Sequence, residues 1–138
     1  MCIRDRYNPF FPEISGADCQ HCHGGANFEN DKYMNNGIDA EADIVDIGRQ
    51  KVTENPADRA KFKVPSLRNI AVTAPYMHDG SVATLEDVID QYMLGGSGHV
   101  NQSELIKSFN LTELEKSDLI NFLSALTDEE FISNSDFK

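Results

Sequence analysis

The sequence predicts an all-α domain made of short helices and long loops. Two segments have helical apolar spacing and capping residues, the strand signal is weak throughout, and the connecting stretches are rich in Asn, Gly, Ser and Asp. A length of 138 residues suits one domain with one core. The chain has no Trp and only 9% aromatic residues, so the core is thin for this length. A large apolar cofactor would help to fill it.

The two clearest helical segments lie in the C-terminal half. Thr84 is expected to cap a helix over 85–93, where apolar residues recur at helical spacing until a Gly-Gly pair ends the helix. Thr112 and Glu115 form a capping box at the start of the second helix. The apolar face of that helix consists of Leu119, Phe122, Leu123 and Leu126.

The remainder of the chain is expected to be rich in loops. A short helix is predicted to run from Ile14 to Gln20, and single turns are predicted at Ala40–Ile44, Pro56–Ala60 and Pro65–Ile70. No run approaches the roughly 20 apolar residues that a membrane-spanning helix needs. We therefore expect no membrane span in this chain.

The chain is expected to divide into a leader over residues 1–12, a domain over 13–128 and a polar tail over 129–138. The opening Met1–Arg6 resembles a translated adapter sequence, so part of the leader is expected to be artefactual and Cys2 to have no role. No signal peptide is recognisable at this end. The natural protein is expected to extend further upstream.

The charge balance argues against two classes of partner. The chain has 12 Lys and Arg against 23 Asp and Glu, a formal net charge of −11. Nucleic acid and anionic membrane surfaces both require clustered basic residues. An acidic surface can be merely solvated, or it can steer a basic redox partner by complementary charge.

The chemistry-bearing motif is Cys19-Gln20-His21-Cys22-His23, a C-x-x-C-H run typical of covalent haem attachment. Two thiols three residues apart on a helical turn can reach the two vinyl groups of one porphyrin. His23 then lies beneath the iron and can donate an imidazole nitrogen. The motif predicts a cytochrome c-like domain around one covalent haem c, bound by Cys19 and Cys22 with His23 as an axial ligand.

Two other uses of this motif are less well supported. A zinc site would need a second spaced ligand pair, which the remaining candidates Cys2, His78 and His99 do not form. A dithiol redox motif expects a βαβ context, and the sequence has none. His21 is expected to point to solvent, and His99 is expected to be a loop residue.

Three further segments, 62–70 (FKVPSLRNI), 73–80 (TAPYMHDG) and 83–88 (ATLEDV), occur in order after the haem motif. Together they closely resemble the C-terminal haem domain of bacterial di-haem cytochrome c peroxidases and MauG-like proteins, and the likeness runs from about Ser15 to Asp128. The resemblance implies an oxidoreductase of the cytochrome c peroxidase family that uses hydrogen peroxide. In that family an N-terminal haem domain, which this chain lacks, cleaves peroxide, and the C-terminal haem is six-coordinate and passes electrons to it. The fragment is therefore expected to be a poor peroxidase alone.

Four residues compete for the second axial position: Met77, His78, Tyr92 and Met93. Tyr92 and Met93 both face inward on the helix over 85–93, so helical phase alone leaves the choice open. The resemblance favours Tyr92, which lies fourteen residues after His78, at the position where the peroxidases have Met and MauG-like proteins have Tyr. It also implies that His78 lies near the haem without binding the iron. A Met ligand raises the haem potential, whereas a phenolate lowers it.

The resemblance implies several further features. Arg68 could pair with a haem propionate, or be an ordinary surface residue. The carbonyls of Thr73 and Pro75 match positions that bind calcium together with an Asn from the other domain. The expected partners are that domain, a small redox protein as electron donor or a protein substrate, and a second copy in a homodimer. The expected location is the periplasm. The rival reading is a stand-alone mono-haem electron carrier without enzymatic activity.

Overall fold

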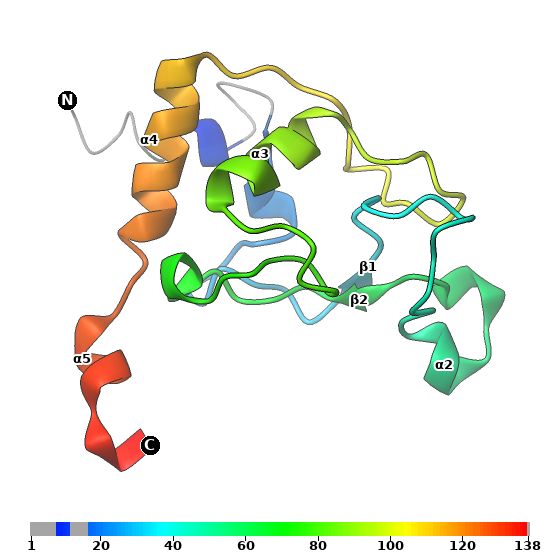
Figure 1. The fold of residues 1–138 in the computed structure, drawn as a ribbon, viewed down its shortest axis with the longest axis horizontal. Coiled ribbons are helices and arrows are strands. Elements are labelled where there is room, and N and C mark those ends of the chain that lie inside the picture. Colours follow the sequence, from blue (N-terminus) through cyan, green and yellow to red (C-terminus); the bar gives the residue numbers. More distant parts are fainter. Residues whose placement is uncertain (1–7, 12–16, 138) are drawn as a thin grey trace.

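The computed structural model describes residues 8–11 and 17–137, and all structural statements concern these residues. Short helical elements joined by long loops dominate the fold (Figure 1). In chain order the elements are η1 (Asn8–Phe10), η2 (Cys19–His21), β1 (Tyr33–Met34), α2 (Gln50–Thr53), η3 (Pro56–Asp58), β2 (Phe62–Lys63), η4 (Ile70–Val72), α3 (Leu85–Met93), α4 (Glu113–Ser124), α5 (Glu129–Ser133) and η5 (Ser135–Phe137). No helix among them is long and apolar enough to cross a membrane.

The apolar core lies where α4 packs against η1, α3 and η4, whereas α2 lies at the opposite end of the molecule (Figure 1). Phe10 is 1% exposed, and its ring centroid lies 5.1 Å from that of Phe122 and 6.0 Å from that of Phe28. Such tilted aromatic contacts each stabilise by about 1 kcal/mol beyond the area they bury. The buried cluster consists of Phe10, Leu67, Leu85, Ile89, Leu119 and Leu123. Phe10 is thus a core residue inside the segment expected to be a leader; residues 1–7 and 12 of that segment lie outside the described part.

The predictions for both C-terminal helices are confirmed. The Thr84 hydroxyl accepts a hydrogen bond from the Asp87 amide at 3.1 Å at the start of α3. The Thr112–Glu115 capping box is present at the start of α4. Gly95, just after α3, has φ 85°, and a Cβ there would lie 2.5 Å from the Ser108 amide nitrogen. Only glycine fits that close approach, so the chain must turn away from the helix at this point.

The expectation of an all-α fold omitted a small sheet. Strands β1 and β2 pair antiparallel, with Tyr33 opposite Lys63 and Met34 opposite Phe62. Two-residue strands are too short to produce an alternating pattern in the sequence. They also form only by pairing with a segment far along the chain, which no local pattern indicates. The sheet joins the loop after the cysteine motif to the segment that leads into η4.

The smaller elements match their predictions unevenly. The turn at Ala40–Ile44 and the one that begins at Pro56 are confirmed, the latter as η3. The turn expected over Pro65–Ile70 begins later, as η4. The predicted helix over Ile14–Gln20 lies partly outside the described residues; in the described part, Asp18 is left-handed with φ 50° and only the 3₁₀ turn η2 follows. The segment expected to be a polar tail contains α5 and η5.

Candidate haem site

The two motif cysteines lie on the 3₁₀ turn η2 and at its end, where the Cys22 amide donates to the Cys19 carbonyl at 3.2 Å. Both are half-buried free thiols. Burial raises the pKa of the Cys19 thiol to about 12 and raises the pKa of Cys22 as well. The structure therefore presents two reduced, unpaired cysteines on one turn, and thioether attachment to vinyl groups requires reduced cysteines.

The orientation of His23 fits an iron ligand. Its Nδ1 lies 3.0 Å from the carbonyl oxygen of Pro65, and because a carbonyl only accepts, Nδ1 carries the proton. The lone pair then lies on Nε2, the nitrogen left for a metal. Burial is the main cause that lowers the pKa of His23 and favours the neutral ring that a metal ligand must have. A backbone partner on Nδ1 also orients the ring and increases its basicity.

The chain holds the Pro65 carbonyl in place by bonding the flanking residues to the loop after the motif. The Val64 amide donates to the Lys32 carbonyl at 3.0 Å, and the Leu67 amide donates to the Phe28 carbonyl at 3.3 Å. Val64 and Leu67 are both buried. The acceptor for His23 is thus part of the packed framework, although it is 42 residues away in sequence.

Tyr92 extends from α3 toward the same region. Burial is the main cause that raises the pKa of its phenol; the hydrogen bond from Asn36 lowers the pKa, and the neighbouring thiols of Cys19 and Cys22 raise it. The Asn36 amide nitrogen lies 3.5 Å from the Tyr92 oxygen.

The other candidates for the second axial position are placed differently. Met77 has φ 70° in the turn between the paired residues Tyr76 and Val82, and its sulfur lies 3.4 Å from the Asn36 amide nitrogen. Met93 packs against the apolar core cluster. The ring of His78 stacks on Phe62 at 4.0 Å and lies 3.4 Å from an Asp39 carboxylate oxygen.

Arg68 and the two calcium candidates lie on the surface. The Arg68 guanidinium donates to the Ala26 carbonyl, in the loop just after the haem motif, at 2.7 Å. Thr73 and Pro75 are exposed, and the Thr73 hydroxyl bonds the Ile70 carbonyl at 3.0 Å. The calcium site stays a prediction. The zinc reading gains no support, because residues 8–11 and 17–137 contain no cluster of three His, Cys, Asp or Glu side chains that could hold a metal ion.

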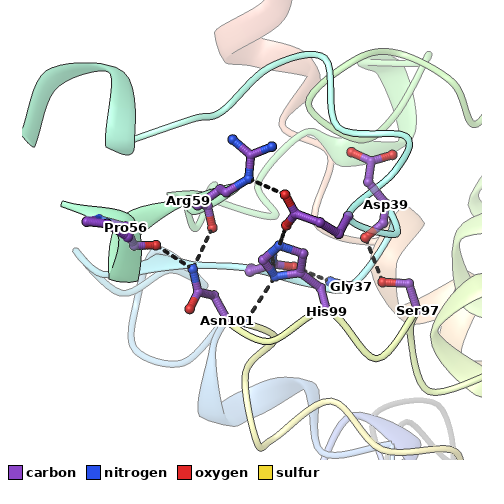
Figure 2. Close-up of polar contacts among 9 residues, drawn as sticks. Gly37, Asp39, Pro56, Arg59, Ser97, His99 and Asn101 are labelled. Atoms are coloured by element: carbon purple, nitrogen blue, oxygen red, sulfur yellow. Dashed lines mark hydrogen bonds and ion pairs between the residues drawn. The ribbon is translucent and has the colours of Figure 1, made fainter. Parts of the chain in front are cut away.

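His99 lies in a loop, as predicted, but the sequence did not reveal that this loop residue is buried and hydrogen-bonded. Its side chain is 0% exposed, and its Nε2 donates to Glu41 at 2.7 Å. Its Nδ1 accepts from the Asn101 amide at 3.0 Å and from the Asn35 side chain at 3.1 Å. The Arg59 Nε donates to the same carboxylate at 2.8 Å. Figure 2 labels Arg59 and His99 in this network. Because Glu41 and Asn35 lie 58 and 64 residues away, no local pattern could have indicated these contacts.

Known proteins resemble the chain over most of its length. No protein-family model matches it. It is 34% identical over 148 residues to the cytochrome-c peroxidase IdrP1 of Pseudomonas sp. (strain SCT), covering 87% of this chain and 39% of the relative. It is 38% identical over 115 residues to the methylamine utilization protein MauG of Methylorubrum extorquens, covering 82% of this chain and 32% of that protein.

Two solved structures also resemble the chain. The crystal structure of a MauG-like protein associated with microbial copper homeostasis superposes with a TM-score of 0.88 at 38% identity, over 99% of this chain and 50% of that one. The di-haem peroxidase BthA from Burkholderia thailandensis shares the fold, with a TM-score of 0.72 at 18% identity, over 96% of this chain and 44% of BthA.

The chain belongs to the family of bacterial di-haem cytochrome c peroxidases and MauG-like proteins. It spans about a third to two-fifths of the length of these curated relatives, 39% for IdrP1 and 32% for MauG. This coverage is consistent with the C-terminal haem domain of such a protein, as the motifs predicted.

Proposed function

We propose that this chain is the electron-transfer haem domain of a periplasmic di-haem enzyme that oxidises its substrate with hydrogen peroxide. Cys19 and Cys22 would attach one haem c in a cytochrome c-like fold, and His23 and Tyr92 would bind its iron. The observation that carries this proposal is the His23–Pro65 hydrogen bond of 3.0 Å, which puts the proton on Nδ1 and the lone pair on Nε2 in a residue that directly follows two free cysteines of one motif.

His23 and Tyr92 would have different roles at the haem. Bound haem supplies a one-electron redox centre. His23 binds with an orientation set by Pro65, and Tyr92, as an anionic oxygen ligand, would lower the potential. Two protein ligands would leave peroxide no position to bind, so peroxide cleavage belongs to the N-terminal haem domain. The Tyr92 ligand is supported by the influence of both thiols on its phenol and by the packing of Met93 against the apolar core.

The rival function, a stand-alone electron carrier, is not favoured. The relatives on which the family assignment rests are named as cytochrome-c peroxidases or as MauG. An electron carrier would also require no second domain, whereas the chain matches about a third to two-fifths of each of these proteins.

Other roles extend the proposal. Arg68 would pair with a haem propionate through the donors not bound to Ala26. The Thr73 and Pro75 carbonyls would contribute to a calcium site completed by the N-terminal domain. The net charge of −11 would favour a basic redox protein as partner or substrate. A homodimer is part of the same proposal.

Covalent attachment is tested by expressing the chain with a cytochrome c maturation system. The colour should stay with the protein after denaturation and acid–acetone extraction. Cys19→Ala should shift the pyridine haemochrome band toward that of a single thioether, and Cys19→Ala/Cys22→Ala should lose covalent haem. Cys2→Ala is the matched control and should change nothing. Haem that extracts from the unmodified protein would refute the proposal.

A further inference from the structure

One side chain touches both of the competing donor atoms near the haem motif. The Asn36 amide nitrogen lies 3.4 Å from the Met77 sulfur and 3.5 Å from the Tyr92 oxygen. That nitrogen carries two hydrogens, so it can donate one to each atom. The sulfur and the phenol oxygen can be no further apart than the sum of these two distances. Both atoms therefore lie within reach of one amide nitrogen, that of Asn36.

The orientation of the Asn36 amide follows from its own contacts. Its Oδ1 accepts a hydrogen bond from the Ile38 amide at 3.3 Å, so the oxygen and nitrogen ends are distinguished by their partners. The nitrogen end faces Met77 and Tyr92. The contact to the Tyr92 oxygen is long for a hydrogen bond, and a thioether sulfur is a weak acceptor, so each contact is weak taken singly. Because one nitrogen donates to both atoms, replacing Asn36 changes the surroundings of Met77 and Tyr92 together.

The backbone on each side of Asn36 is anchored. The preceding residue, Asn35, bonds His99 at 3.1 Å, and the Ser97 amide donates to the Gly37 carbonyl at 2.7 Å. Gly37, Ser97 and His99 belong to the polar network of Figure 2. A Cβ at Gly37 would lie 2.4 Å from the side-chain oxygen of Gln102, so the two loops are in close contact. The amide of Asn36 is thus held by buried structure rather than by the ligand candidates themselves.

We propose that Asn36 is a positioning residue on the distal side of the haem: it polarises the Tyr92 ligand and keeps the Met77 sulfur from replacing it. The inference rests on the proposed Tyr92 ligand. A donor to an anionic oxygen withdraws charge that the oxygen would otherwise give to ferric iron. Asn36 therefore raises the potential relative to an unbonded phenolate. A sulfur that accepts a hydrogen bond from the same amide is held back from the metal.

The first part is tested in a Met77→Leu background, where ligand exchange with that sulfur cannot occur. Adding Asn36→Leu should favour the ferric state about tenfold, which is the effect of one lost hydrogen bond to a charged atom. For a one-electron couple this lowers the midpoint potential by about 59 mV. Ser97→Ala removes the Ser97 bond to the Asp39 carbonyl in the adjoining loop and is the matched control. An unchanged or higher potential in the double variant would overturn the polarising role.

The second part is tested in a Tyr92→Phe background, because loss of the Asn36 donor would also strengthen phenolate binding to ferric iron and so oppose ligand exchange. Asn36→Leu/Tyr92→Phe should show a stronger ferric near-infrared sulfur-to-iron band than Tyr92→Phe alone, and adding Met77→Leu should remove the gain. An equal band in Tyr92→Phe and Asn36→Leu/Tyr92→Phe would overturn the restraining role. If Asn36→Leu fails to accumulate, Asn36→Asp keeps the acceptor for Ile38 and removes both donors, and the same two results are expected.

These outcomes are separable from failure of the proposed function. Loss of haem on acid–acetone extraction would refute the haem domain itself. If the haem is covalent but its potential and spectrum do not change when Asn36 is replaced, this inference alone is refuted. A purely structural role for Asn36 would change the midpoint of unfolding but not the potential in the Met77→Leu background.

Discussion

Replacing His99 with Leu tests whether the buried polar network holds the haem-site loops together. The two side chains have similar volumes, so the substitution removes hydrogen bonds without opening a large cavity. It leaves the Asn101 amide and the Asn35 side chain without their acceptor. Asn35 is 3% exposed, so water cannot readily replace the lost partner.

The expected loss of stability is about 3 kcal/mol, because a buried donor left unsatisfied costs about 1–3 kcal/mol and the variant leaves two such donors. Loss of the His99–Glu41 hydrogen bond adds little to this cost in stability, since the Glu41 side chain is 60% exposed and solvent screens it. That loss is a large fraction of the ~5–15 kcal/mol by which domains are stable.

Guanidinium unfolding of the haem-bound protein, followed by far-ultraviolet circular dichroism, measures the effect. Glu41→Gln is the control, because it alters the same network at its exposed end and should cost much less than His99→Leu. If the two variants unfold at the same denaturant concentration, the buried acceptor role of His99 is wrong.

Three further outcomes follow from the structure. Asp118 is 5% exposed, and its Oδ1 has no hydrogen-bond partner within the described ranges, so Asp118→Asn should raise stability by about 1 kcal/mol in the same assay, while exposed Asp31→Asn should not. The thin core implies that haem supplies much of the buried apolar area, so Cys19→Ala/Cys22→Ala should lack a cooperative thermal transition; an apo form that melts as sharply and as high as the holo form would contradict this. If His23 and Tyr92 fill both axial positions as proposed, the isolated chain should turn over hydrogen peroxide no faster than free haem, and robust turnover would show an open iron.

Local signals predicted the parts of the fold that local interactions determine. Thr84 and Thr112 were recognisable as helix caps because their partners are three residues away. The sheet, the core role of Phe10 and the start of η4 depend on distant segments, and their sequences contain no pattern that predicts them. Asp18 illustrates the same limit, since its left-handed backbone interrupts the helix expected before the motif.

The candidate site divides in the same way. Cys19, Cys22 and His23 could be proposed from the sequence because the chemistry requires their spacing, and Tyr92 because of the family resemblance; these four assignments stay predictions. Asn36 and the carbonyl of Pro65 could not be proposed in this way, since a loop amide and a backbone oxygen have no distinctive pattern in sequence. Their contacts span 56 and 42 residues, so only the folded chain could show them.

The identity of the distal ligand tests the account most directly. The measurement is the ferric near-infrared spectrum, together with the midpoint potential, of Tyr92→Phe and Met93→Leu beside the unmodified protein. The unmodified protein should lack the sulfur-to-iron band and have a low potential for a cytochrome c; Tyr92→Phe, which keeps the ring and removes only the oxygen, should raise the potential, and Met93→Leu should change little. A sulfur-to-iron band in the unmodified protein that Met93→Leu abolishes and Tyr92→Phe leaves intact would contradict the account.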